Sequence, residues 1–191
     1  MSKYTNNPDI EMTVKSRRSF LKTLGAGSVF LACPGLARAA VASDYASRHL
    51  AFDNLHTGEK LAITYFENGS YIADALTQIN HLLRDHRTGD IHHIDPALLD
   101  VLHTVKQKLA LQQPFQIVSG YRSPKTNTML NKTTHGVAKK SLHMQGKAID
   151  ICVEKPDLKH IRDVAIALGR GGVGYYPGSF VHLDTGNVRS W

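Results

Sequence analysis

The sequence predicts an α+β fold in which helices pack on one side of a small, mainly antiparallel sheet. Three segments repeat apolar residues at steps of three and four, which is typical of helices with one buried face. Short apolar or alternating runs, bounded by glycine, proline and polar residues, indicate strands. Helices are concentrated early in the predicted domain and strands late, and this segregation favours an α+β arrangement.

Two hairpins are expected, one near each end of the predicted domain. The first joins residues 48–54 to residues 61–66 through a polar turn. The second joins residues 172–176 to residues 180–184 through Pro177-Gly178. Two more strands, both apolar enough to be buried, are expected at residues 115–118 and 148–153.

Three amphipathic helices are expected between and after these strands. The first spans residues 71–87, and the second begins at Asp95, a good N-cap residue that a proline follows. The third runs over residues 158–168 and stops at Gly169. Residues 123–140 are polar and irregular, so a short helix and a long loop are expected there.

Residues 1–39 have the layout of a twin-arginine export signal. The Arg17-Arg18 pair precedes an uncharged apolar stretch at residues 23–33, and Ala37-Arg38-Ala39 offers small residues to a signal peptidase. The apolar stretch, about 11 residues, is too short to cross a bilayer about 30 Å thick. We therefore expect an exported, periplasmic protein without a membrane span.

The exported domain is expected to comprise residues 43–191, since cleavage could fall as late as residue 42. Cys33 loosely matches a lipid-acylation site, but Phe30 and Pro34 are unusual around such a site, so anchoring is not expected. Once the signal is removed, Cys152 is the only cysteine left. The domain therefore has no intramolecular disulfide and depends on its core, and on any bound metal, for stability.

The charge distribution argues against nucleic-acid binding. The whole chain has a formal net charge of +7, but residues 1–39 carry +4 of it, which leaves +3 for the rest. Residues 40–191 contain no run of basic residues that suggests a binding patch.

A first candidate site lies at His143 and Asp150. Residues 148–153 alternate as a strand, so Asp150 lies on the face opposite Ile149 and Ile151, which belong in the core. Gly146 allows the preceding loop to bend back and bring His143 near Asp150. A histidine and an aspartate placed in this way can bind zinc.

The strand at residues 180–184 offers a second candidate cluster. Its alternation places His182 and Asp184 on one face and the apolar Val181 and Leu183 on the other. If the strands that carry Asp150 and His182 are neighbours, His143, Asp150 and His182 form a catalytic type of zinc site with three protein ligands. Without a metal, Asp150 would cap a turn and His182 would be an ordinary half-buried histidine.

Arg122 is the third candidate. It lies in the turn Ser119-Gly120-Tyr121-Arg122-Ser123, which directly follows a buried strand. Its planar guanidinium can hold a substrate carboxylate or polarise a carbonyl oxygen. A salt bridge at the end of the strand is the structural alternative.

Together these segments resemble the zinc D-Ala-D-Ala metallopeptidases of bacterial cell walls. The resemblance rests on Ser-Gly-Tyr-Arg-Ser at 119–123, Ser-x-His-x-x-Gly-x-Ala-x-Asp at 141–150 and the late strand histidine His182. Within that family the chain is most similar to the murein endopeptidase K branch, on motifs that include residues 54–59, 136–141 and 171–177.

The resemblance implies a hedgehog-like fold, zinc held by His143, Asp150 and His182, and hydrolysis of peptidoglycan cross-links that contain meso-diaminopimelate. It also implies peptidoglycan stem peptides as partners. Two alternatives to this function remain: a D-alanyl carboxypeptidase, and a non-catalytic wall-binding protein with a structural zinc ion. Arg122 would help to stabilise the oxyanion.

The sequence departs from many relatives where they carry an acid or a second histidine shortly before the last zinc histidine. Here those positions hold Ser179 and Phe180. Asp184 is then a candidate catalytic base, but it could equally fix the ring of His182 or bind the metal itself.

Overall fold

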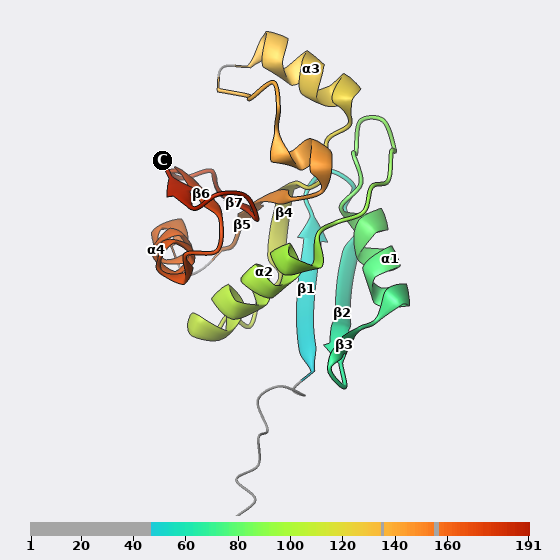
Figure 1. Ribbon diagram of the computed structural model, residues 1–191, viewed down its shortest axis with the longest axis vertical. Coiled ribbons are helices and arrows are strands. Elements are labelled where there is room, and N and C mark those ends of the chain that lie inside the picture. Colours follow the sequence, from blue (N-terminus) through green and yellow to red (C-terminus); the bar gives the residue numbers. More distant parts are fainter. Residues whose placement is uncertain (1–46, 135, 155–156) are drawn as a thin grey trace, which may run out of the picture. The chain divides into compact units, whose positions relative to one another are not determined.

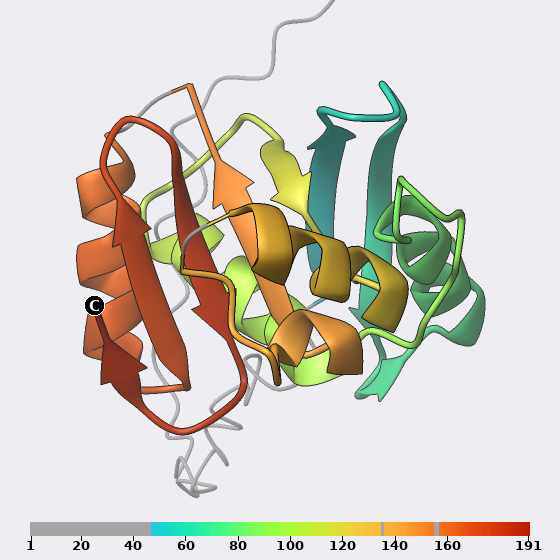
Figure 2. The same cartoon turned by 90° about the horizontal axis from the view of Figure 1, so that it is seen from above.

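The eight strands of the described residues form one mixed sheet, in the order β3-β2-β1-β4-β5-β7-β6-β8 (Figures 1 and 2). A computed structural model describes residues 47–134, 136–154 and 157–191 of the chain. The predicted export signal, its cleavage site and Cys33 lie outside these residues. The strands are β1 (Arg48–Asn54), β2 (Lys60–Glu67), β3 (Ser70–Tyr71), β4 (Phe115–Ser119), β5 (Ala148–Cys152), β6 (Gly172–Tyr176), β7 (Phe180–Asp184) and β8 (Arg189–Ser190).

Most strand pairs in this sheet are antiparallel, as predicted. Only β1 with β4 and β6 with β8 run parallel among the described strands. Both predicted hairpins are present, as β1–β2 and β6–β7. The prediction of a small sheet was wrong, because the two-residue strands β3 and β8, too short for any alternation pattern, extend its edges.

The helices of the described residues are α1 (Ala73–Leu82), α2 (Pro96–Lys108), α3 (Pro124–Thr133) and α4 (Leu158–Leu168), with a 3-10 helix, η1 (Leu142–Gln145). Asp95 caps α2 by accepting a hydrogen bond from the backbone N–H of Ala97 at 3.0 Å. Gly169 ends α4 with a left-handed φ of 61°. Both boundaries agree with the sequence prediction.

The first helix is shorter than the predicted 71–87. It ends at Leu82 because the chain that follows has other partners. The carbonyl of Leu83 accepts a hydrogen bond from the N–H of Tyr121 at 2.8 Å. The Asp85 carboxylate accepts one from the N–H of Ser123 at 2.9 Å, so residues 83–90 form a loop that contacts the start of α3.

One face of the sheet carries the hydrophobic core. Leu50 and Phe52 of β1, Ile149 of β5 and Leu183 of β7 are buried there against α1, α2 and α4. Helix α3 does not join this layer, and Figure 2 shows it in front of the sheet with α2 behind. The prediction of helices on one side therefore holds for three helices and is wrong for α3, which has no buried apolar stripe to pack on the core.

No helix in the described part of the chain is long and apolar enough to cross a membrane.

Candidate metal centre

The polar face of the sheet brings the predicted ligands together. Strands β5 and β7 pair antiparallel, and Asp150 lies directly opposite His182 in that pairing. Their neighbours Ile149 and Val181 face the core, so the period of two places both polar side chains on the other face. The strands that carry Asp150 and His182 are therefore neighbours, as the sequence argument required.

His143 reaches this face from η1, which a tight local structure holds in place. The Ser141 hydroxyl caps η1 by accepting a hydrogen bond from the N–H of His143 at 3.3 Å. Gly146 ends η1 with φ 64°, and a Cβ there would lie 2.0 Å from the carbonyl oxygen of His93. Only glycine fits both the left-handed backbone and this close approach, so Gly146 bends the loop as predicted.

Three side-chain atoms converge at the centre of the site. His143 Nε2 lies 3.2 Å from His182 Nδ1 and 3.3 Å from Asp150 Oδ1. His182 Nδ1 lies 2.8 Å from Asp150 Oδ1. All three residues are largely buried, and His143 is only 2% exposed.

This geometry fits a tetrahedral metal ion. Zinc bound to nitrogen and oxygen at about 2.0–2.2 Å requires ligand atoms about 3.3 Å apart, close to the separations observed here. Two imidazole nitrogens and one carboxylate oxygen are also a donor set that zinc accepts.

Each ligand is oriented by a partner outside the cluster. His143 Nδ1 donates to the carbonyl oxygen of Gly120 at 2.7 Å, which leaves Nε2 to face the centre. His182 Nε2 donates to Asp184 Oδ2 at 3.1 Å, which leaves Nδ1 to face the centre. Arg122 Nη2 donates to Asp150 Oδ2 at 2.7 Å, so the other carboxylate oxygen is turned inward.

The three side chains of the cluster differ in their protonation preferences. Burial lowers the pKa of His143, which therefore tends to be neutral and able to offer a lone pair. Burial would raise the pKa of Asp150, but the two histidines lower it far below its usual range. Burial would lower the pKa of His182, but hydrogen bonds to Asp150 and Asp184 raise it. A metal ion that binds here would displace the proton that the raised pKa favours on His182.

Asp184 lies behind His182, on the side of the ring away from the cluster. Its side chain is fully buried, and its Oδ1 accepts from the N–H groups of Gly172 at 2.9 Å and Gly186 at 2.8 Å. Arg189 Nη2 donates to its Oδ2 at 2.6 Å. Burial would raise the pKa of Asp184, but these hydrogen bonds lower it below its usual range.

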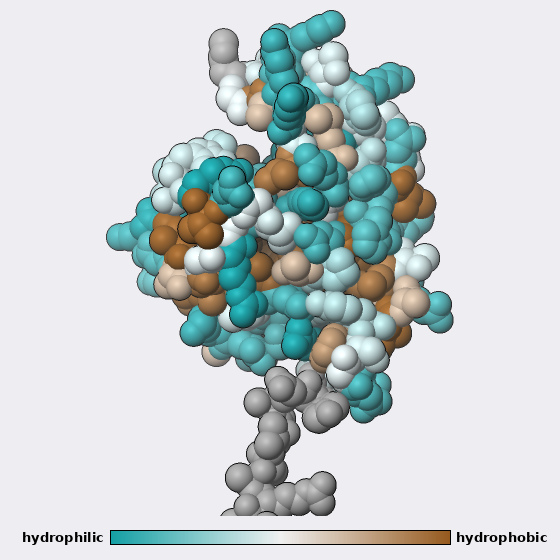
Figure 3. All heavy atoms as spheres, viewed as in Figure 1, coloured by the Kyte–Doolittle hydropathy of each residue, from teal (hydrophilic) through white to brown (hydrophobic). Residues whose placement is uncertain are grey.

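The cluster opens into a cavity of about 350 Å³. One wall is formed by Thr134 and residues 136–138 after α3, and the other by the aromatic side chains of Tyr176, Phe180 and Trp191. Figure 3 shows the corresponding notch between the part of the surface that carries α3 and the part that carries β6 and β7. Arg122 also lines the cavity, together with the three candidate ligands.

The aromatic wall brings together residues of the β6–β7 hairpin and Trp191. Tyr176 and Phe180 stack with ring centroids 4.4 Å apart, while Tyr175 packs against the core. Trp191 lies 5.4 Å from the His182 ring and donates from Nε1 to the Tyr176 hydroxyl at 3.1 Å. The two-residue strand β8 that places Trp191 gives no pattern that sequence analysis could detect. His135, which lies between the cavity-lining residues Thr134 and Gly136 in the sequence, is outside the described residues.

The fold and the site define a class of protein. An α+β domain that gathers two imidazoles and a carboxylate at the base of an open cavity has the donor set of metal-dependent hydrolases. A family model described as "Peptidoglycan L,D-endopeptidase MepK" matches residues 42–191. The chain therefore belongs to this family of peptidases, hydrolases that act on peptide bonds, and the family resemblance predicted from the sequence is confirmed.

Similar proteins carry the same name. The peptidoglycan L,D-endopeptidase MepK of Escherichia coli (strain K12) is 46% identical over 145 residues, which cover 75% of this chain and 80% of that protein. The relative from Shigella flexneri has the same identity and coverage. The probable peptidoglycan L,D-endopeptidase MepK of Haemophilus influenzae is 39% identical over 146 residues, or 75% of this chain and 78% of that protein.

Proposed function

We propose that this chain is a zinc-dependent L,D-endopeptidase that hydrolyses peptide cross-links of peptidoglycan during wall growth or remodelling. The single observation that carries the proposal is the convergence of His143, Asp150 and His182 at the base of a cavity, in a member of this family. The bond cleaved would join an L centre to a D centre, and meso-diaminopimelate carries one of each. Cross-links that contain this residue are therefore the proposed substrate.

In this proposal His143, Asp150 and His182 hold the zinc ion. A bound zinc ion supplies a Lewis acid that lowers the pKa of water toward about 7 and polarises the amide carbonyl. The protein fixes which atoms face that ion, through Gly120, Asp184 and Arg122. Because these partners are already hydrogen-bonded, little rearrangement is needed when the metal binds.

We assign Arg122 two tasks. Its ion pair with Asp150 orients the carboxylate, and its place in the cavity wall brings a fixed positive charge near the scissile carbonyl. Its Nε also donates to the Ser119 hydroxyl at 2.9 Å, so the guanidinium is held on two sides. A preorganised cation at this position would stabilise developing negative charge on the carbonyl oxygen.

We assign Asp184 to positioning His182 rather than to proton abstraction. Its Oδ2 accepts hydrogen bonds from His182 Nε2 and Arg189, its Oδ1 accepts from the Gly186 N–H, and it is not among the residues that line the cavity. A general base must reach the water whose proton it removes. The buried position of Asp184 therefore favours the orienting role.

The proposed location is the periplasm, reached by the twin-arginine route. Support comes from the Arg17-Arg18 pair with its apolar stretch, and from relatives named as peptidoglycan enzymes. We propose residues 1–39 as the signal and residues 43–191 as the mature domain. The family match that begins at residue 42 is compatible with that boundary.

Incubation of the purified protein with muropeptide dimers tests the function. An endopeptidase converts dimers to monomers, whereas a carboxypeptidase only removes a terminal D-alanine, so product masses distinguish the two. A chelator should stop the reaction and added zinc should restore it. His143→Ala should abolish turnover while most of the fold is retained. If dimers persist in the presence of zinc and His143→Ala instead unfolds the protein, the metal is structural and the enzyme assignment fails.

A further inference from the structure

The chain has an unusual gap in its acidic residues. Between Asp100 and Asp150 it contains neither aspartate nor glutamate. Residues 122–147, which we call the basic segment, instead carry six basic side chains: Arg122, Lys125, Lys132, Lys139, Lys140 and Lys147. The modest net charge of residues 40–191 conceals this local excess, because acidic residues elsewhere in the sequence offset it.

The basic segment forms one side of the candidate active site. It contains α3 and η1, and Thr134, residues 136–138, Ser141 and His143 within it line the cavity. Asn127 of α3 donates to the carbonyl oxygens of Ala138 at 3.0 Å and Lys139 at 3.4 Å. These hydrogen bonds tie the loop to the helix, so the lysines stand on a wall fixed beside the metal centre.

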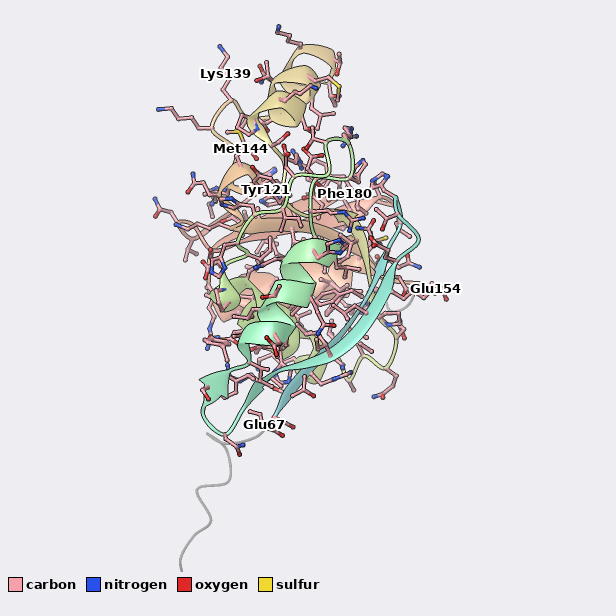
Figure 4. All side chains as sticks on the ribbon, turned by 90° about the vertical axis from the view of Figure 1, so that its right-hand side faces the viewer. Glu67, Tyr121, Lys139, Met144, Glu154 and Phe180 are labelled. Atoms are coloured by element: carbon pink, nitrogen blue, oxygen red, sulfur yellow. The ribbon has the colours of Figure 1, made fainter. Side chains whose placement is uncertain are left out.

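The five lysines of the basic segment are all exposed. Among the described residues none of them forms an ion pair with a carboxylate, whereas Arg48, Lys60 and Arg84 do on the rest of the domain. Figure 4 shows Lys139 at the end of the molecule that carries α3, while Glu67 and Glu154 lie well away from it. The outer surface of this end is largely hydrophilic in Figure 3. Its positive charge is therefore available to an external anion.

The two walls of the cavity differ in chemistry. The basic segment borders one side, and the exposed aromatic rings of Tyr176 and Trp191 form the other. A ligand with carboxylates on one side and aliphatic groups on the other matches this pair of walls. Peptidoglycan stem peptides have that composition, because their acidic residues carry free carboxylates beside alkyl chains. Nucleobases also stack on aromatic rings, so binding to a nucleic acid is an outcome that the test below includes.

We propose that the basic segment binds free carboxylates of the stem peptides that flank the scissile bond, and so selects non-amidated cross-links. This inference rests on the proposed function and adds a substrate feature to it. Lys139 and Lys140 carry most of the effect, since they follow directly after the cavity-lining residues 136–138. Electrostatic contacts of this kind act on encounter and binding more than on the chemical step.

The test compares Lys139→Gln/Lys140→Gln with a matched control, Lys108→Gln/Lys159→Gln. The control removes two exposed lysines from α2 and α4, on the opposite face of the sheet. At low salt we expect KM for free-acid dimers to rise about fivefold in the first variant, with kcat kept within about twofold. The control should be unchanged, and the difference should shrink in high salt.

A comparison of amidated with free-acid dimers tests whether carboxylates are the groups that the lysines bind. If carboxylates are the ligand, the wild type should bind amidated dimers about fivefold more weakly than free-acid dimers, and the lysine variant should bind both alike. Equal effects of the variant on amidated and free-acid dimers, or an equal rise of KM in the control, would overturn the proposal. Loss of binding to single-stranded RNA or to anionic vesicles, with KM unchanged, would assign the basic segment to another ligand and also overturn it.

Binding to intact sacculi keeps this test independent of catalysis. Both lysine variants are combined with His143→Ala, and co-sedimentation with native and amidated sacculi is measured. Reduced binding to native sacculi in the Lys139/Lys140 variant supports the proposal even if the wild type proves inactive. If turnover is normal and sacculus binding is unaffected by the variant, the proposed function stands and this inference is refuted.

Discussion

Asp85 is expected to contribute a large pH-dependent share of the stability. It is buried in the loop after α1, where its carboxylate accepts from the N–H groups of Ser123 and Arg87, each at 2.9 Å. Burial would raise the pKa of Asp85, but these bonds and those from the Thr126 and Ser123 hydroxyls lower it to about 2. The unfolded chain has a pKa of about 3.9, so the difference of about 2 units corresponds to about 2.5 kcal/mol.

The sign follows from the direction of this shift. A carboxylate whose pKa is lowered by folding stabilises the protein above the unfolded pKa and loses that contribution as the pH falls. Asp85 should therefore contribute its full share at pH 7 and lose it between about pH 4 and pH 2. Asp85→Asn should remove about 2.5 kcal/mol at pH 7 and much less at pH 2.

Urea unfolding of the wild type and Asp85→Asn between pH 7 and pH 2 measures this effect. Glu67→Gln, which neutralises an exposed carboxylate on β2, is the control and should be nearly neutral throughout. The reasoning is refuted if wild type and Asp85→Asn lose stability in parallel as the pH falls. Because Asp85 holds Ser123, the N-cap of α3, the variant should also raise KM through a less ordered basic segment.

Three further outcomes are expected around the metal centre. Asp184→Asn should weaken zinc affinity about 10–100-fold in competition with a chromophoric chelator, and unchanged affinity with a collapsed kcat would instead identify Asp184 as the base. Trp191 is the only tryptophan and lies 5.4 Å from His182, so zinc titration should change its emission; an unchanged spectrum in the zinc-loaded protein would contradict this placement. Gly174→Ala would put a Cβ 2.7 Å from the Trp191 ring, and urea unfolding should show a loss of about 1–3 kcal/mol, whereas a neutral effect would mean that Trp191 is not packed there.

Alternation made the convergence of the three candidate ligands predictable from the sequence. Asp150 of β5 and His182 of β7 each lie between apolar residues, and Asp184 follows Leu183 at the end of β7. The burial of Ile149, Val181 and Leu183 in the core therefore places Asp150, His182 and Asp184 on the opposite face. The pairing of the two strands could not be read in the same way, because no local pattern encodes which strands are neighbours. The sequence argument had to assume that these two strands are neighbours, and the structure shows that β5 pairs with β7.

The walls of the cavity were harder to predict because their determinants are not periodic. Helix α3 buries Thr126 and Asn127 rather than an apolar stripe, so its sequence shows no apolar face that would pack on the core. Its position depends on polar contacts with Asp85 and the loop at 137–139, which are far apart or irregular in sequence. The six basic side chains of the basic segment are spread over residues 122–147, so they do not stand out as a patch in the sequence, and only their location beside the cavity gives their charge a role.

The charge balance of the metal centre connects these features. Its two carboxylates, Asp150 and Asp184, are each paired with an arginine, Arg122 and Arg189. With both histidines neutral the cluster has no net charge, so a divalent cation would leave the site close to +2. A site whose ligands do not cancel the charge of the ion keeps more of its ability to lower the pKa of water and to polarise a carbonyl. The same excess charge attracts an anionic peptide, and the lysines beside the cavity extend that attraction outward. The arginines thus allow two carboxylates to orient the site without neutralising it.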